Sequence, residues 1–246
     1  MINNKILPDI SIIVPVYKVE AYIGRCAKSL FEQTFNNPEY IFVNDCTPDG
    51  SMEIVHRILA LYPHRMDQVK IINHSTNKGV AAARNTGLKH ATGRYIGWVD
   101  SDDWVDSIMF EQLFTVAEKY DSDIVRCDFY NSFTDHEDYQ SQYCKENKIA
   151  CLQSFLVGKI HGGLCFSIVK KEIYDKHKIR FSEEHGVMED ARVMVQLFYH
   201  ADTIRHIPRA YYHYVKDKAD SITTRWANDP SVEAAAKANL LETIEF

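Results

Sequence analysis

Four groups of polar side chains in the 246-residue sequence have types and spacings that suit chemistry. The densest is the stretch 98–104, WVDSDDW, in which Asp100, Asp102 and Asp103 directly follow an apolar run. Carboxylates this close repel one another, so a cation or a set of hydrogen-bond donors must neutralise them. In an extended segment alternate side chains share a face, so Asp100 and Asp102 can address the same ligand. Mg²⁺ typically combines one or two carboxylates with water and phosphate oxygens, and Mn²⁺ accepts similar ligands.

This acidic stretch alone leaves two interpretations open. In the first, Asp102 or Asp103 caps the helix that follows, and the other carboxylates are solvated. In the second, the cluster binds a divalent cation. Because the cluster stands at the end of a predicted buried strand, where ligands of such sheets bind, the second interpretation becomes about as strong as the first.

A second group lies in the stretch 43–51, VNDCTPDGS. Proline, aspartate and glycine are ordinary turn residues, so a polar turn explains the last four positions of this stretch. A turn does not explain why Asn44 and Asp45 stand at the end of the predicted strand. A carboxylate in that position can accept the N3–H of a uracil, which is the one donor on the pairing edge of that base.

The third group is the stretch 77–87, NKGVAAARNTG, where Arg84 and Asn85 stand on an alanine-rich predicted helix. A fork-shaped guanidinium suits a diphosphate, and a solvated arginine is the alternative. The fourth group, Glu189 and Asp190, opens another predicted helix, where acids commonly stabilise the helix dipole. The functional alternative is a general base that takes a proton from an acceptor hydroxyl.

These groups stand on a chain whose first half alternates β-branched runs with amphipathic segments. Strands are predicted over 9–16, 39–45, 68–73, 94–100 and 123–128, and helices over 21–33, 51–62, 79–91 and 107–120. Such alternation implies right-handed crossovers and a mainly parallel sheet covered on both faces. Farther along we expect a loop over 129–148, a helix over 149–158, a strand over 162–170, a helix over 188–201 and a strand over 209–216. No repeat or Gly/Ser linker divides the chain, so one α/β domain is predicted.

Ligands of open parallel sheets bind beyond the carboxyl ends of the strands. Three predicted strands end near Pro15 and Tyr17, near Asn44 and Asp45, and at Asp100, so we expect one site along this edge. The sequence has no G-x-G-x-x-G after the first strand and no G-x-x-x-x-G-K-[ST], which disfavours a dinucleotide site and a triphosphate P-loop. Phosphates would therefore need a metal or basic side chains.

The composition of the chain further limits the classes of partner that it is expected to bind. The formal net charge of -6 and the pI near 6.0 give no overall attraction to nucleic acid, so no nucleic-acid partner is expected. No apolar run approaches the ~18 residues of a spanning helix. The N-terminal apolar stretch is interrupted by Pro8 and Asp9 and is interpreted as a strand, not a signal peptide. The six cysteines form no C-x-x-C pair, which favours free thiols and a cytoplasmic protein that can still dock at a membrane surface.

With the four groups in this order, the sequence resembles family 2 glycosyltransferases of the GT-A fold. The matching stretches run from about residue 9 to 215 and are ISIIVPVYKVEAYIGRCAKSL, YIFVNDCTPDGS, NKGVAAARNTGLKHATGRYIGWVDSDDW and VMED. The resemblance implies one GT-A domain over 1–246, with a Rossmann-like, mainly parallel sheet flanked by helices. A nucleotide-sugar half would cover about 8–128, and a mixed acceptor-side half about 129–246.

The resemblance also implies an activity. It is metal-dependent, inverting transfer of a hexose or N-acetylhexosamine from a nucleotide-diphosphate sugar, with a UDP-sugar expected, to a hydroxyl group. The implied acceptor is a glycan or a lipid-linked molecule in the synthesis of bacterial cell-surface polysaccharide or lipopolysaccharide. Peripheral association with the inner face of the membrane and the oligomeric state are left open.

On the donor side, the resemblance implies a role for five residues. Pro15 and Tyr17 would flank the base, and Asp45 would accept a hydrogen bond from uracil. Arg84 would lie beside the nucleotide, and Asp100 would face the ribose.

At the metal and acceptor, the resemblance implies that Asp102 ligates Mn²⁺ or Mg²⁺ bridging the diphosphate, with Asp103 supporting the turn. Asp190, aided by Glu189, would be the catalytic base. His213 resembles a position that approaches the metal or the diphosphate. A packed histidine among neighbouring tyrosines is an equally strong alternative for His213.

The sequence departs from the family pattern at Cys46, where a glycine is usual, and in the stretch 165–174, which lacks a common Trp-Asn-Lys. Two enzyme classes fit poorly. A nucleotidyltransferase needs a glycine- and arginine-rich loop after the first strand, and a D-x-D phosphatase carries its nucleophile there. The remaining alternative is a catalytically inactive module that binds a nucleotide sugar or a glycan.

Overall fold

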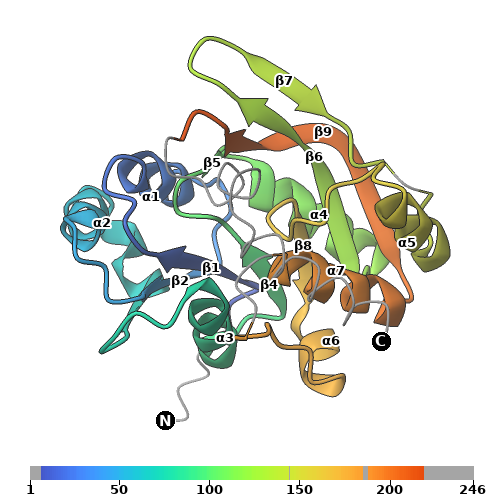
Figure 1. Cartoon of the computed structure of the whole chain (residues 1–246), viewed down its shortest axis with the longest axis horizontal. Coiled ribbons are helices and arrows are strands. Elements are labelled where there is room, and N and C mark those ends of the chain that lie inside the picture. Colours follow the sequence, from blue (N-terminus) through green and yellow to red (C-terminus); the bar gives the residue numbers. More distant parts are fainter. Residues whose placement is uncertain (1–6, 144, 185–187, 219–246) are drawn as a thin grey trace.

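The computed structural model describes residues 7–143, 145–184 and 188–218, which form a nine-stranded sheet with helices on both faces (Figure 1). The strand order is β3-β2-β1-β4-β8-β6-β9-β5, and β7 pairs with β6. The strands are β1 (Ile10–Val16), β2 (Pro38–Asn44), β3 (Val69–Asn73), β4 (Tyr95–Trp98), β5 (Trp104–Val105), β6 (Ile124–Ser132), β7 (Glu137–Gln140), β8 (Ser167–Lys170) and β9 (Ile204–Val215).

The first half of the sheet is parallel, as the alternation of elements predicts. β1 pairs with both β2 and β4 in parallel, and β2 pairs with β3 in the same way. The connecting helices are α1 (Ile23–Phe31), α2 (Ser51–Leu59), the 3₁₀ turn η1 (Pro63–Gln68) and α3 (Val80–His90). The strands are continuous apolar runs because both of their faces are covered.

Beyond β4 the sheet becomes mixed. β8 runs antiparallel to both β4 and β6, whereas β9 is parallel to β6 and antiparallel to β5. The helices of this half are α4 (Met109–Tyr120), α5 (Lys148–Leu156), α6 (Lys171–Lys176) and α7 (Glu189–His200). The result is an α/β fold with a mixed second half, in agreement with the expected fold class.

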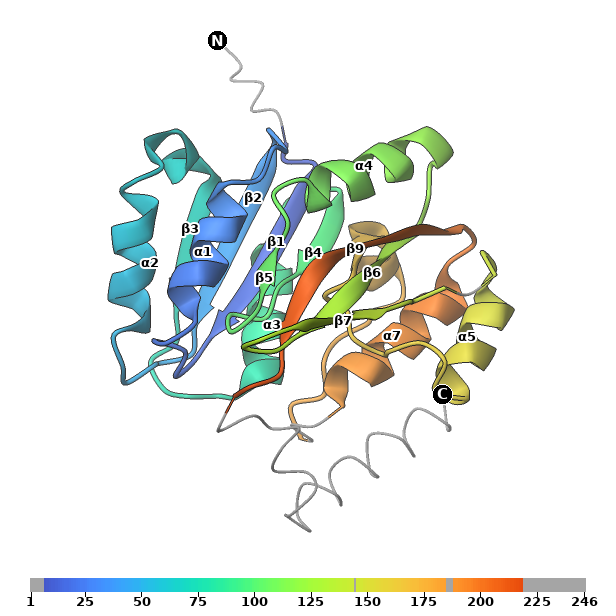
Figure 2. The ribbon, with the colours of Figure 1, turned by 90° about the horizontal axis from the view of Figure 1, so that it is seen from above.

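Alternating strand residues decide which helix covers which face. On one face of the sheet, Phe42 of β2 packs against Phe31 of α1. On the other face, Ile13 of β1 lies under α3. Figure 2 shows α3 and α7 on one side of the sheet and α4 on the other. At Gly87 of α3, a Cβ atom would lie 2.3 Å from Cγ2 of Ile13, so only glycine allows α3 to approach the sheet this closely.

The structure corrects several predicted elements. The segment 129–148, predicted as a loop, contains the end of β6 and all of β7, which form a polar antiparallel hairpin. β9 begins at Ile204, five residues before the predicted strand, and β5 and α6 were not predicted. These elements are short or polar, so they carry little hydrophobic periodicity.

The cysteines also differ in part from the expectation of free thiols. Cys26, Cys46, Cys127 and Cys165 are free, whereas Cys151 is disulfide-bonded. A membrane span was not expected, and none of the helices within the described ranges is long and apolar enough to cross a bilayer.

Candidate active site

The carboxyl ends of β1, β2 and β4 lie next to one another, as expected for neighbouring parallel strands. Val16 is in register with Asn44, and Trp98 is in register with Ile13. The segments that follow these strands therefore share one edge of the sheet, and they carry Tyr17, Asp45 and Asp100. This edge is the candidate site.

Asp45 is 2% exposed and organises the loop before α3. Its Oδ1 accepts a hydrogen bond from the backbone N–H of Lys78 at 2.9 Å and contacts Nδ1 of His74 at 2.7 Å. Its Oδ2 accepts a hydrogen bond from the N–H of Gly79, at the N-terminus of α3, at 2.8 Å. Asp45 thus holds the segment 74–79 against the end of β2, in addition to the base contact that the resemblance implies.

Backbone strain marks several positions next to the predicted site residues. Lys18 follows Tyr17 with φ 54°, Cys46 follows Asp45 with φ 55°, and Met188 precedes Glu189 with φ 60°. This left-handed region is uncommon for residues other than glycine, and such strain often collects at functional sites. A glycine at the position of Cys46 would adopt this conformation without strain.

Pro15 and Tyr17 flank the turn after β1. Pro15 is half-buried within β1, and Tyr17 is 40% exposed at the edge of the sheet. An exposed ring at this edge is free to stack on a flat ligand.

Arg84 joins two carboxylates that are far apart in the sequence. Its Nη2 donates a hydrogen bond to Oδ1 of Asp100 at 3.0 Å, and its Nη1 pairs with Oε1 of Glu189. Burial lowers the pKa of Arg84, but Glu189 and Asp100 offset that effect and raise it above its ordinary value. Arg84 therefore stays charged and links α3, the end of β4 and the start of α7.

Asp100 is held on several sides. In addition to Arg84, its Oδ2 lies 3.4 Å from the thiol of Cys165, and its backbone N–H donates a hydrogen bond to the hydroxyl of Tyr212 at 3.2 Å. Burial alone would raise the pKa of Asp100, but Arg84 holds it below its usual range. Asp100 is thus an ionised acceptor at the edge of the sheet.

The other two acids of the stretch contact Lys218. The ammonium of Lys218 lies 2.6 Å from Oδ2 of Asp102 and 2.9 Å from Oδ1 of Asp103. Asp103 also accepts hydrogen bonds from the hydroxyl of Tyr212 and the N–H of Val215. Burial and the neighbouring Asp102 raise the pKa of Asp103 to about 8. Asp103 thus ties the turn to β9 and caps no helix, because α4 begins after Ile108.

The acid cluster suits a hard divalent cation that binds together with phosphate. The side chain of Asp102 remains 30% exposed and supplies carboxylate oxygens. Within the described ranges, no group of three or more His, Cys, Asp or Glu side chains is arranged to hold a metal. Mg²⁺ and Mn²⁺ fit this donor set because they combine one or two carboxylates with water and phosphate oxygens.

His213 takes part in packing between strands. Its ring stacks on Trp104 with the ring centroids 3.4 Å apart. Its Nδ1 contacts Glu137 at 2.7 Å, and its Nε2 contacts Asp106 at 3.1 Å. Both ring nitrogens therefore face carboxylates other than Asp102, which favours the packed-histidine alternative over a metal ligand.

Glu189 and Asp190 are the first two residues of α7. Glu189 is buried against Arg84, and burial raises its pKa to about 7, although Arg84 counteracts the shift. Asp190 is half-buried, and its Oδ1 accepts a hydrogen bond from the N–H of Ala191. A carboxylate that titrates near neutral pH, next to a second and more accessible one, suits proton transfer.

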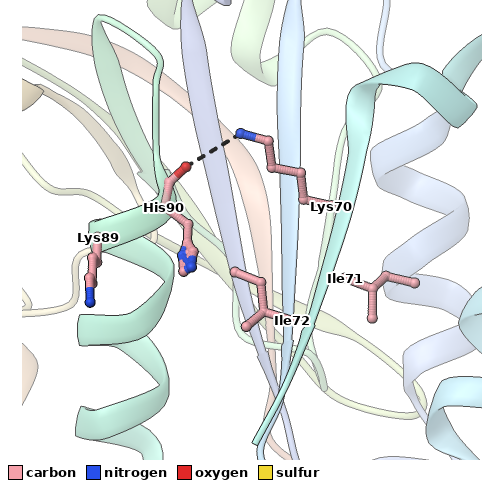
Figure 3. Close-up of a pocket in the computed structure, with 5 residues that line it drawn as sticks. All are labelled: Lys70, Ile71, Ile72, Lys89 and His90. Atoms are coloured by element: carbon pink, nitrogen blue, oxygen red, sulfur yellow. Dashed lines mark hydrogen bonds between the residues drawn. The ribbon is translucent and has the colours of Figure 1, made fainter.

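A cavity of about 540 Å³ lies away from this edge, between β3 and the end of α3 (Figure 3). It is lined by Lys70, Ile71, Ile72, Lys89 and His90, and none of these residues belongs to the predicted site. The candidate site is therefore separate from this cavity. The site lies along the carboxyl edge of the parallel strands, where ligands of such sheets bind.

The sequence interpretation missed three contributors, namely Lys218, Tyr212 and Cys165. Each contacts the acidic stretch from a position at least 65 residues away in the sequence. Tyr212 stands in a predicted strand and Cys165 in a stretch that departs from the family pattern, and no sequence pattern gives either residue a role. No local spacing signals contacts of this range, because they depend on which strands pair in the second half of the sheet.

Solved structures of glycosyltransferases have this fold. Staphylococcus aureus TarS, residues 1–349, solved with UDP-GlcNAc, superimposes with a TM-score of 0.78 at 22% identity, over 95% of this chain and 66% of that solved chain. A mannosyltransferase from Pyrobaculum calidifontis, solved with GDP-Man and Mn²⁺, gives a TM-score of 0.64 at 17% identity, over 89% of this chain and 60% of that one. The architecture is therefore that of a GT-A glycosyltransferase.

Sequence comparison identifies the family. The profile described as "Glycosyl transferase family 2" matches residues 11–178, and the chain belongs to this family. It is 34% identical to the Bacillus subtilis glycosyltransferase EpsJ over 224 residues, which are 88% of this chain and 63% of EpsJ. It is 32% identical to the Bacillus subtilis minor teichoic acid biosynthesis protein GgaB over 230 residues, 89% of this chain and 24% of GgaB. The chain thus spans less than two thirds of these relatives.

Proposed function

We propose that this chain transfers a sugar from a nucleotide-diphosphate donor to a hydroxyl acceptor, with inversion at the anomeric carbon. The observation that carries the proposal is the bridge made by Arg84. It joins Asp100, on the edge where a donor would bind, to Glu189, at the start of the acceptor-side helix. One guanidinium thereby brings the two halves of a transfer site together.

We propose a uridine nucleotide as the donor, because TarS was solved with UDP and with UDP-GlcNAc. Tyr17 would stack against the base, beside Pro15. Asp45 would position the segment 74–79 around the base, and a direct bond from uracil N3–H would use its remaining lone pairs. Asp100 would accept a hydrogen bond from the ribose.

Asp102 would hold Mn²⁺ or Mg²⁺ together with the diphosphate. Such a cation neutralises the charge that develops on the leaving diphosphate. Arg84 stays charged, and from beneath the proposed donor site its positive field would stabilise the same leaving group. His213 would support the turn from the β5–β9 pair, without a bond to the metal.

On the acceptor side, Asp190 would take the proton from the attacking hydroxyl. Glu189 would hold Asp190 in place through its pair with Arg84. The hydroxyl then attacks the face opposite the departing nucleotide, which gives inversion. Removal of a general base typically slows such a reaction about 10²- to 10⁴-fold.

The relatives EpsJ and GgaB suggest an acceptor in bacterial cell-surface polysaccharide or teichoic acid synthesis. We propose a glycan or lipid-linked acceptor, reached by a cytoplasmic protein at the inner face of the membrane. A donor-binding half over 8–128 and an acceptor-side half over 129–246 would divide this work.

Thermal-shift measurements with UDP-sugars and GDP-sugars, with and without Mn²⁺, test the donor and metal assignments. We expect stabilisation by a UDP-sugar only when Mn²⁺ is present, and its loss in Asp102→Asn. Stabilisation that ignores the metal and survives Asp102→Asn would contradict the metal role.

An inactive binding module is the alternative function. Asp190→Asn separates the two, because a transferase would lose donor hydrolysis or sugar transfer while it still binds UDP. Binding without turnover by the wild type, across a panel of donors and acceptors, would favour the module. NMR of the product anomer tests inversion.

A further inference from the structure

The acidic stretch is neutralised by side chains of the chain itself. Arg84 contacts Asp100, and Lys218 contacts both Asp102 and Asp103. Three neighbouring carboxylates therefore have two cations within ion-pair distance. The repulsion expected from the sequence is relieved before any metal binds.

Lys218 is well placed for this role. Its side chain is only 7% exposed, although it follows the end of β9. The ammonium groups of Lys216 and Lys218 both lie over the ring of Tyr214, 4.6 and 5.3 Å from its centroid. Over the described ranges, no ion pair joins Lys216 to Asp102 or Asp103, so the contact is specific to Lys218.

Lys218 and a metal compete for the same atom. The ammonium lies 2.6 Å from Oδ2 of Asp102, which is one of the two oxygens that Asp102 can offer to a cation. An ammonium and a divalent cation repel each other, so binding of both against this carboxylate is disfavoured. A metal that binds Oδ2 without another ligand displaces Lys218 and leaves that buried ammonium with fewer partners.

A nucleotide diphosphate removes this penalty. Its phosphate oxygens are acceptors for an ammonium, and they also complete the coordination of Mg²⁺ or Mn²⁺. When the two ligands arrive together, Lys218 can exchange Asp102 for a phosphate oxygen while it keeps Asp103. The geometry thus favours joint binding over binding of the metal alone.

We propose that Lys218 is a donor-binding residue that occupies Asp102 in the free protein and moves to the diphosphate when donor and metal bind. This inference rests on the proposed donor-binding function. It assigns to Lys218 two opposite effects: the residue weakens binding of the metal alone and strengthens binding of the nucleotide with its metal. A merely structural lysine would produce neither effect.

The test measures Mn²⁺ binding by electron paramagnetic resonance of the free ion, and UDP binding by calorimetry in saturating Mn²⁺. In Lys218→Met we expect Mn²⁺ alone to bind about 10- to 100-fold tighter and UDP to bind about 10- to 100-fold weaker, the range for a hydrogen bond between charged groups. The control Lys216→Met should match the wild type in both measurements. Lys218→Arg keeps a cation and should restore much of the UDP affinity.

The outcomes are separable. Equal Mn²⁺ affinity in the wild type and Lys218→Met, including no measurable binding by either, would overturn this inference. If the wild type binds neither UDP nor GDP with Mn²⁺, the proposed function itself fails. Should Lys218→Met not fold, because buried Asp103 loses its cation, the double variant Asp103→Asn with Lys218→Met removes that charge and is measured in its place, against Asp103→Asn alone.

Discussion

Replacement of Arg84 by lysine tests the bridge between the two halves of the site. A lysine keeps the charge but has one compact ammonium instead of two separate Nη atoms, so at this position it cannot reproduce both contacts at the spacing that the guanidinium gives. We expect it to keep Glu189, whose side chain is 8% exposed, and to lose Asp100, whose side chain is 32% exposed. The lost bond is the one from Nη2 to Oδ1 at 3.0 Å. Hydrogen bonds between charged groups contribute about 1.5–3 kcal/mol. Because Asp100 is partly hydrated, we expect the variant to lose about 2 kcal/mol of its free energy of unfolding.

Urea unfolding at about pH 8, followed by far-UV circular dichroism, measures this loss as a lower midpoint at an unchanged slope. Arg57→Lys, on the exposed surface of α2, is the matched control and should remain within about 0.5 kcal/mol of the wild type. An Arg84→Lys variant as stable as this control would refute the reasoning, because a guanidinium that bridges two carboxylates cannot be replaced without loss.

Three further predictions follow from the packing and charges of the site. Gly87→Ala places a Cβ 2.3 Å from buried Ile13. The overpacking cost of up to about 3 kcal/mol should exceed the roughly 1 kcal/mol that alanine gains over glycine in a helix. A urea midpoint no lower than that of the wild type would contradict this prediction. Asp45→Ala removes the acceptor that holds the segment 74–79, so limited proteolysis should cut this segment faster than in the wild type, and equal rates would argue against the anchoring role. Burial raises the pKa of Glu189 to about 7 in the folded protein, from an ordinary 4.5. Protonated Glu189 therefore stabilises the folded state fully below about pH 4.5, and this stabilisation is lost as the pH rises through about 7. The thermal midpoint should therefore fall between about pH 5 and about pH 8, and less so in Glu189→Gln; an identical fall in that variant would exclude Glu189 as the cause.

The parallel half of the fold was predictable because its signals are local. β-branched runs and amphipathic segments gave β1 to β4 and α1 to α3 to within a few residues. The same runs placed Asp45 and Asp100 at neighbouring strand ends, since parallel strands share one carboxyl edge. This part of the site needs only strand order and direction, and both follow from right-handed crossovers.

The second half was less predictable because its contacts are not local. Lys218 shows this limit: it contacts Asp102 across 116 positions, and no spacing in the sequence signals that pairing. His213 shows the converse, since its predicted metal role followed from resemblance alone, whereas its ring is stacked on Trp104. β7, and with it the β6–β7 hairpin, was missed because this short, polar and exposed strand has no buried face.

The turn that carries the acids is held by the last strand of the described chain. The hydroxyl of Tyr212 accepts the N–H of Asp100, 112 positions earlier, and donates to Asp103, while Val215 donates its N–H to Asp103 as well. During synthesis, the parallel strands leave the ribosome long before these partners do. A nascent chain can therefore complete its parallel sheet while the acidic turn still lacks its anchors. The acidic turn is then completed only after β9 has emerged from the ribosome and paired with β5.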